Sequence, residues 1–109
     1  DNEKLMNAVT AISGSGPAYV FLIIEALSKA GIEVGLHKDL AEELALMTVV
    51  GAGALAISSD TSPAELRRRV TSPGGTTEAA LDVLMDNENL STLLKEAVLA
   101  ATERGKDLA

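Results

Sequence analysis

Cysteine is absent from the 109 residues, and histidine occurs only once, at His37. Without thiols the chain has neither a disulfide framework nor a thiolate metal ligand, and one imidazole cannot form a zinc site by itself. We therefore expect no metal site. Because His37 directly precedes a long apolar stretch, a surface or helix-capping position is expected for it.

Aromatic residues make up only 2% of the chain, although 47% of it is hydrophobic. The apolar residues are mostly alanine, leucine, valine and isoleucine, which suit close contacts between helices better than a core built around large rings. Tyr19 carries the only aromatic hydroxyl, and we expect it in a helical core or at an interface.

Positive charge is scarce, since 9 lysines and arginines face 16 acidic residues, for a net charge of −7. Nucleic-acid binding requires a basic patch, so we expect no nucleic-acid partner. The one basic run, residues 67–69, follows Glu65 and is typical of a solvated helix face. An anionic ligand or a subunit contact is the alternative for this run.

No apolar leader follows the polar start of the chain, so we see no signal peptide and expect a cytoplasmic protein. The most apolar stretch lies within residues 38–58, where Thr48 is the only polar residue between Leu44 and Ile57. A membrane span needs about 20 apolar residues, so this stretch is too short to cross a bilayer comfortably. We expect no membrane partner and interpret the stretch as a central helix buried on all sides.

Helical periodicity begins early in the chain, and we find no credible pair of strands. Residues 2–8 fit either a short helix or a turn. The run SGSGP at 13–17 breaks the chain and places a proline in the first turn of the next helix. Apolar residues then follow one stripe as far as Ala30, after which Gly31 and Gly35 supply stop signals.

The second half of the chain contains three further helices. Ser62 can cap a helix, Pro63 suits its first position, and Glu65 can complete a capping box. This helix is short and is expected to end near Val70. The remaining helices are expected from about residue 76 to residue 85 and from residue 90 onwards.

About five helices in a chain this small, one of them apolar on every side, need more cover than one subunit offers. We therefore predict an all-α bundle, formed by residues 1–109 as one domain, that assembles into an interlocked homodimer with the two central helices buried together. Gly51 and Gly53 lie inside the central helix, where glycine costs about 1 kcal/mol relative to alanine. Their presence indicates that helix backbones approach each other closely there.

Residues 51–56 imitate the dinucleotide fingerprint G-x-G-x-x-A. That motif needs a strand before it, a helix after it and an acidic residue about 20 positions further on. Here the preceding residues from Leu40 have helical periodicity, and Asp60 and Glu65 come too early. We expect helix packing rather than cofactor binding at this position.

The candidate site is the run TSPGGTT at 71–77. Gly74 and Gly75 permit a tight turn that brings amide N–H groups forward at the start of a helix. A helix N-terminus with free amides and nearby hydroxyls readily binds an anion such as a carboxylate or a phosphate. The alternative, which composition alone favours, is an ordinary loop in which Thr76 or Thr77 caps its own helix.

Three stretches of the chain resemble the pyrroline-5-carboxylate reductase family. They are TAISGSGPAYVF at 10–21, Gly35-Leu36 with the helix that holds Leu44, Ala45, Thr48, Val49, Gly51 and Ala52, and PAEL at 63–66 followed by VTSPGGTT at 70–77. The match covers nearly the whole chain. The pairing of SGSGPAY at 13–19 with TSPGGTT at 71–77 is highly specific.

The resemblance implies the C-terminal dimerisation and substrate-binding domain of an enzyme that reduces 1-pyrroline-5-carboxylate to L-proline with NADPH or NADH in proline biosynthesis. In this family a Rossmann domain precedes the segment and binds most of the cofactor, so the segment alone is expected to dimerise without activity. The substrate lies between the cofactor domain of one subunit and helical segments contributed across the dimer. Larger rings of dimers also occur in the family.

The resemblance also assigns roles to residues of the candidate loop. The family's substrate carboxylate is held by the loop that matches Ser72, Gly74, Gly75 and Thr76, and the hydroxyl matching Thr77 contacts the ring nitrogen. This agrees with the anion-site interpretation and favours it over the capped loop. Because a threonine hydroxyl is a poor acid near neutrality, we assign Thr77, the candidate catalytic residue, substrate orientation first and proton transfer second.

The main alternative is a free-standing helical interaction module with no enzymatic role. A glycine-rich strand–helix fingerprint encoded upstream of Asp1 would support the enzyme. The chain departs from the family at His37, where proline is frequent, and at Arg68, where an acidic residue is frequent. Both departures concern local capping and surface charge only.

Overall fold

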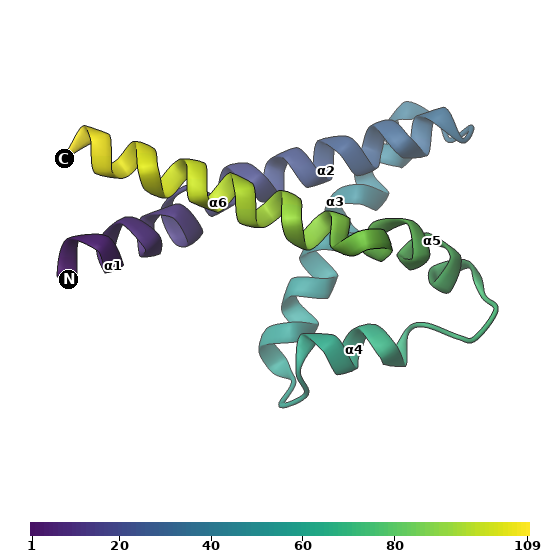
Figure 1. Ribbon diagram of the computed structural model, residues 1–109. Helices are drawn as coiled ribbons and strands as arrows, with labels where there is room; N and C mark the ends of the chain where they lie inside the picture. The colour runs from purple at the N-terminus through teal and green to yellow at the C-terminus, as the bar shows by residue number, and fades with distance from the viewer. The chain divides into compact units, whose positions relative to one another are not determined.

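The computed structural model describes residues 1–109, and every regular element in it is helical (Figure 1). In chain order the elements are α1 (Asn2–Val9), the π-helical segment η1 (Thr10–Gly14), α2 (Gly16–Glu33), α3 (Lys38–Ser58), α4 (Pro63–Arg69), α5 (Thr76–Met85), the 3₁₀ turn η2 (Asp86–Glu88) and α6 (Asn89–Leu108). The all-α class is confirmed. The α-helices number six rather than about five. The additional helix is α1, in the segment whose sequence fitted either a short helix or a turn.

Local signals set the ends of most helices as predicted. The Ser62 hydroxyl accepts a hydrogen bond from the Glu65 N–H at 3.2 Å, and Pro63 is the first residue of α4. At the end of α2, Gly35 has a φ of +109°, and the Leu36 N–H donates to the Gly31 carbonyl at 3.0 Å. This is the hydrogen bond of a Schellman cap, in which glycine takes the left-handed conformation.

Gly31 does not end α2, which continues to Glu33, so the prediction of a stop signal at Gly31 is wrong. A Cβ atom at Gly31 would lie 3.2 Å from the Cβ of Ala41 and 3.3 Å from the Cδ1 of Leu36. The glycine is therefore explained by the close approach of α3 to α2 rather than by helix termination.

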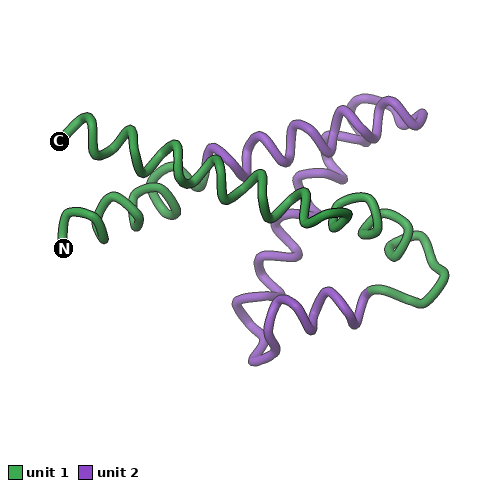
Figure 2. The backbone as a smooth tube through the Cα atoms, viewed as in Figure 1, with its two compact units in different colours: residues 1–17, 71–109 green, residues 18–70 purple.

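The chain divides into two compact units (Figure 2). Residues 1–17 and 71–109 form the first unit, and residues 18–70 form the second. Residues near the two ends of the chain therefore belong to the same unit, whereas the second unit is continuous in sequence.

In the first unit α6 packs against α1 and η1, and α5 leads through η2 into the start of α6. Ala11 in η1 is buried. Contact between the terminal helices is close, because a Cβ at Gly105 would lie 3.1 Å from the Oδ1 of Asn7. The second stretch of this unit begins with the candidate loop, which lies immediately before α5.

In the second unit α2 and α3 form a helical hairpin, followed by the short helix α4. The buried residues are Ser28 on α2 and Ala41 and Ala45 on α3. Small side chains at these positions let the two helices approach each other, but they bury little apolar surface.

The single chain leaves most of α3 uncovered. Leu44, Met47 and Val50 are each about half exposed, and Ile57 is 89% exposed. The exposure of α3 in a single chain agrees with the prediction that one subunit offers too little cover for this helix. Burial of α3 against a second chain stays a prediction.

Two stretches, Asn2–Glu33 and Lys38–Ser58, are long and apolar enough to cross a membrane, with mean hydropathies of 1.4 and 1.7. Length and composition alone do not distinguish a membrane span from a helix covered by other parts of a soluble protein. The absence of a membrane partner likewise stays a prediction.

Candidate functional site

Residues 72–75 form a tight turn in front of α5. The Gly75 N–H donates to the Ser72 carbonyl at 3.0 Å, and Gly74, the third residue of the turn, has a φ of +73°. Proline at the second position and a positive φ at the third are the signature of a type II turn. The order Ser-Pro-Gly-Gly therefore specifies the backbone conformation of the turn.

The first amides of α5 have no acceptor within the helix. The first α-helical hydrogen bond runs from the Ala79 N–H to the Gly75 carbonyl at 3.3 Å, so the amides of the three residues 76–78 precede it. Gly75 is the N-cap and provides no side-chain cap. The alternative in which Thr76 or Thr77 caps its own helix is therefore not the arrangement in this structure.

All five predicted site residues lie in this turn and the first turn of α5. Ser72, Gly74 and Thr76 are exposed, whereas Gly75 and Thr77 are half-buried. The turn is thus open to solvent. An open helix N-terminus carries a partial positive charge and exposed donors, which together favour an anion.

Sequence reasoning missed one residue of this region, Glu78. The Gly74 N–H donates to the Oε1 of Glu78 at 3.1 Å. Glu78 occupies the third position of α5, from which a glutamate commonly reaches back to cap the helix entrance. The spacing Gly75-x-x-Glu78 was the signal for this contact. Its consequence is that one amide of the turn already binds a carboxylate.

A comparison with family models identifies the family of the chain. A family model described as pyrroline-5-carboxylate reductase dimerisation matches residues 3–108. The chain belongs to this family. The resemblance inferred from the sequence motifs is therefore confirmed.

Relatives in several organisms carry the name of the enzyme. A pyrroline-5-carboxylate reductase of Pseudomonas aeruginosa is 50% identical over all 109 residues, which correspond to 40% of that protein. The structure of the Coxiella burnetii reductase matches with a TM-score of 0.94 at 47% identity, covering 100% of this chain and 40% of that one. The Plasmodium falciparum reductase with NADP bound matches with a TM-score of 0.90 at 40% identity, covering 95% and 39%. The chain thus spans about 40% of the length of these relatives.

The dinucleotide-like motif of this dimerisation domain does not fit a nucleotide. Residues 51–56 lie inside α3, which is helical without interruption from Lys38 to Ser58. The fingerprint needs a strand followed by a turn, so that amides at the helix start can face the pyrophosphate. Helix packing at these glycines stays a prediction, because a Cβ atom at Gly51 or Gly53 would meet nothing within 4 Å in the single chain.

The basic run is occupied by ion pairs of its own helix. Arg68 lies 3.0 Å and Arg69 4.0 Å from carboxylate oxygens of Glu65. These side chains are more than 40% exposed, as in a solvated helix face, where such pairs contribute little to stability.

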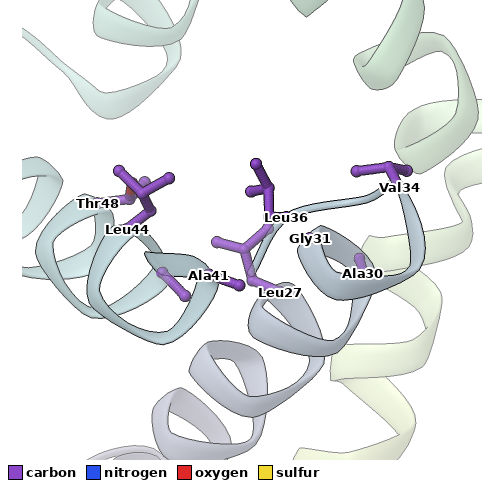
Figure 3. Close-up of a pocket in the computed structure, with 9 residues that line it drawn as sticks. Leu27, Ala30, Gly31, Val34, Leu36, Ala41, Leu44 and Thr48 are labelled. Atoms are coloured by element: carbon purple, nitrogen blue, oxygen red, sulfur yellow. The ribbon is translucent and has the colours of Figure 1, made fainter. Parts of the chain in front are cut away.

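An apolar groove runs along the hairpin of the second unit, where α2 meets α3 (Figure 3). Its volume is about 410 Å³, and its lining is Leu27, Ala30, Gly31, Val34, Leu36, Ala41, Leu44, Ala45 and Thr48. No charged residue lines it. In Figure 3 the side chains of Val34, Leu36 and Leu44 extend toward the same open side. Such a charge-free face resembles the centre of a subunit interface.

Proposed function

We propose that this chain is the dimerisation and substrate-binding part of a cytoplasmic pyrroline-5-carboxylate reductase, which reduces 1-pyrroline-5-carboxylate to L-proline in proline biosynthesis. The observation that carries the proposal is the exposed turn at 72–77, whose open amides begin α5. A small carboxylic acid fits such a site, and relatives of the chain are named as reductases of a small carboxylic acid, pyrroline-5-carboxylate.

The turn has the groups needed to hold and orient this substrate. The carboxylate accepts hydrogen bonds from the Gly74 amide, from the open amides of α5 and from the Ser72 hydroxyl. Thr77 follows within the same helical turn and places its hydroxyl at the ring nitrogen. Holding both ends of a rigid five-membered ring fixes which face of the imine carbon is open to attack.

Reduction of the imine adds a hydride to carbon and a proton to nitrogen. The hydride comes from NADPH or NADH, which we propose is bound mainly by residues outside this chain. The chain corresponds to only 40% of the length of the Pseudomonas aeruginosa reductase, and the one motif here that imitates a nucleotide fingerprint lies within a helix. Thr77 orients the nitrogen and, secondarily, relays the proton that it receives.

We further propose that the chain acts as an interlocked homodimer, from which larger assemblies of dimers are built. It exposes 8491 Å², whereas a monomeric protein of 11.3 kDa exposes about 5700 Å². The buried hydrophobic residues are three alanines, while large apolar side chains along α2 and α3 are open to solvent. The excess area is of the size that obligate homodimers bury.

Two glycines support close contact between helices of the two protomers. A Cβ atom at Gly51 or Gly53 would meet nothing within 4 Å in the single chain. Glycine inside a helix costs about 1 kcal/mol relative to alanine, so its presence calls for a neighbour that the single chain lacks. A helix of the second protomer fits this requirement.

The substitution Thr77→Ala in the full-length reductase tests the site. Loss of the hydroxyl removes the contact to the ring nitrogen, so kcat/KM for 1-pyrroline-5-carboxylate is expected to fall roughly ten- to a hundredfold. Dimer formation is expected to stay intact, because Thr77 lies at the turn rather than on the exposed apolar faces of the hairpin.

Thr77→Ser is the matched control, since it keeps the hydroxyl and is expected to retain most of the activity. Wild-type kinetics in Thr77→Ala would show that the site is assigned wrongly. A free-standing interaction module, the other candidate, predicts no cofactor domain in the same polypeptide and no reductase activity in any version of it.

A further inference from the structure

The carboxylate of Glu78 accepts a hydrogen bond from an amide of the proposed substrate site. Its Oε1 accepts the N–H of Gly74 at 3.1 Å. No lysine or arginine lies within 4.0 Å of this carboxylate, unlike that of Glu65, which pairs with two arginines. The negative charge of Glu78 is therefore held at the turn by backbone groups rather than by a cation.

Helix capping alone does not account for this arrangement. In a capping box the glutamate binds the amide of the N-cap residue. Here the N-cap amide, that of Gly75, already donates to the Ser72 carbonyl, and Glu78 reaches one residue further, to Gly74. It thereby satisfies a donor that belongs to the same open turn as the free amides of α5.

We propose that Glu78 is an internal competitor of the substrate carboxylate, which must displace Glu78 from the Gly74 amide in order to bind. This inference rests on the proposed function of the turn. A ligand with a carboxylate alone gains little by exchanging one carboxylate for another. A ligand that also contacts Thr77 through a ring nitrogen gains more than it displaces. Glu78 therefore weakens the binding of every carboxylate, and only a cyclic imino acid, which has the second contact, keeps a net gain.

The decisive variant is Glu78→Gln in the full-length reductase. The glutamine side chain keeps an acceptor for the Gly74 amide but forms a neutral hydrogen bond, which is weaker than a charged one and more easily displaced. KM for 1-pyrroline-5-carboxylate is expected to fall about three- to tenfold, with kcat within about twofold. Inhibition by acetate is expected to strengthen by a similar factor, because the simple carboxylate no longer meets a charged competitor.

Two further variants separate the contact from the charge. Asp82→Asn removes another exposed charge one helical turn further along α5, about 6 Å away along the axis, and is expected to leave both constants within about twofold. Glu78→Asp keeps the charge on a shorter side chain that no longer reaches Gly74, and a partial fall in KM is expected.

An unchanged or raised KM in Glu78→Gln would overturn the inference, as would an equal fall in Asp82→Asn. The Thr77→Ala measurement distinguishes a failure of the inference about Glu78 from a failure of the proposed function. If Thr77→Ala impairs the enzyme while Glu78→Gln and Glu78→Asp leave KM and acetate inhibition unchanged, only the role of Glu78 is wrong. If Thr77→Ala is also silent, the proposed function of the turn fails with it.

Discussion

At the scale of single residues, the turn before α5 depends on backbone conformation more than on side-chain packing. Gly74 has a φ of +73° and has no atom within 4 Å of the position of a Cβ. A substitution there meets no steric clash with its surroundings and is strained only by its own backbone. Adding one methyl group at Gly74 therefore tests directly whether the turn requires a positive φ at this position.

Gly74→Ala is expected to lower the free energy of unfolding by about 1 kcal/mol, the penalty for a left-handed residue with a Cβ. Substrate KM is expected to rise, because a turn that relaxes toward negative φ moves its amides. Chemical denaturation and steady-state kinetics measure the two effects. Gly16→Ala is the control: it also meets no atom within 4 Å, and unchanged or increased stability is expected there. Equal stability of both variants would contradict a glycine requirement at Gly74.

At the scale of elements, the α2–α3 hairpin depends on small residues where the helices meet. Ala41 and Ala45 are buried, and the Schellman cap at Gly35 sends the chain into α3 within a few residues. The hairpin therefore combines a locally encoded turn with a contact that only small side chains permit.

Gly31→Ala should loosen this contact. The added Cβ would lie 3.2 Å from the Cβ of Ala41, so the helices must move apart by a few tenths of an ångström. Overpacking costs about 1–3 kcal/mol, and alanine gains about 1 kcal/mol over glycine inside a helix, so we expect the free energy of unfolding to fall by about 1 kcal/mol. Thermal and denaturant unfolding measure the change. Lys29→Ala, at an exposed position of the same helix, is expected to change stability by less than about 0.5 kcal/mol. A Gly31→Ala variant as stable as wild type would show that the hairpin adjusts freely.

At the scale of the whole molecule, the exposed apolar surface calls for a second chain. Light scattering or sedimentation of the 109-residue chain is expected to give twice the monomer mass of 11.3 kDa with no binding to lipid vesicles. A monomer, or transfer into vesicles, would contradict the proposed homodimer.

Gly53→Leu tests where the second chain approaches. In the single chain a larger side chain at Gly53 meets open space, so the hairpin itself tolerates it. In the proposed dimer this side chain would separate helix backbones that we expect to pack closely, and the dissociation constant is expected to rise at least about tenfold, equivalent to about 1.4 kcal/mol. Lys95→Leu, an exposed site on α6, provides a control for added apolar surface. Wild-type dimerisation of Gly53→Leu would place the interface elsewhere.

The sequence by itself determined the helical class, most helix ends and the position of the turn at 71–77, because caps, prolines and glycines act within a few residues of chain. The tertiary structure decided that Gly31 lies inside a helix, since its neighbour Ala41 comes from the next element. It also decided that the Gly74 amide is held by Glu78, which depends on the side-chain conformation at the start of α5. The apolar pattern of α3 predicted that one subunit offers too little cover, because a helix that is apolar on every side must be buried against another surface. Which surface covers α3 is decided by packing between helices that are distant in sequence or lie in different chains, and signals that act within a few residues do not encode it.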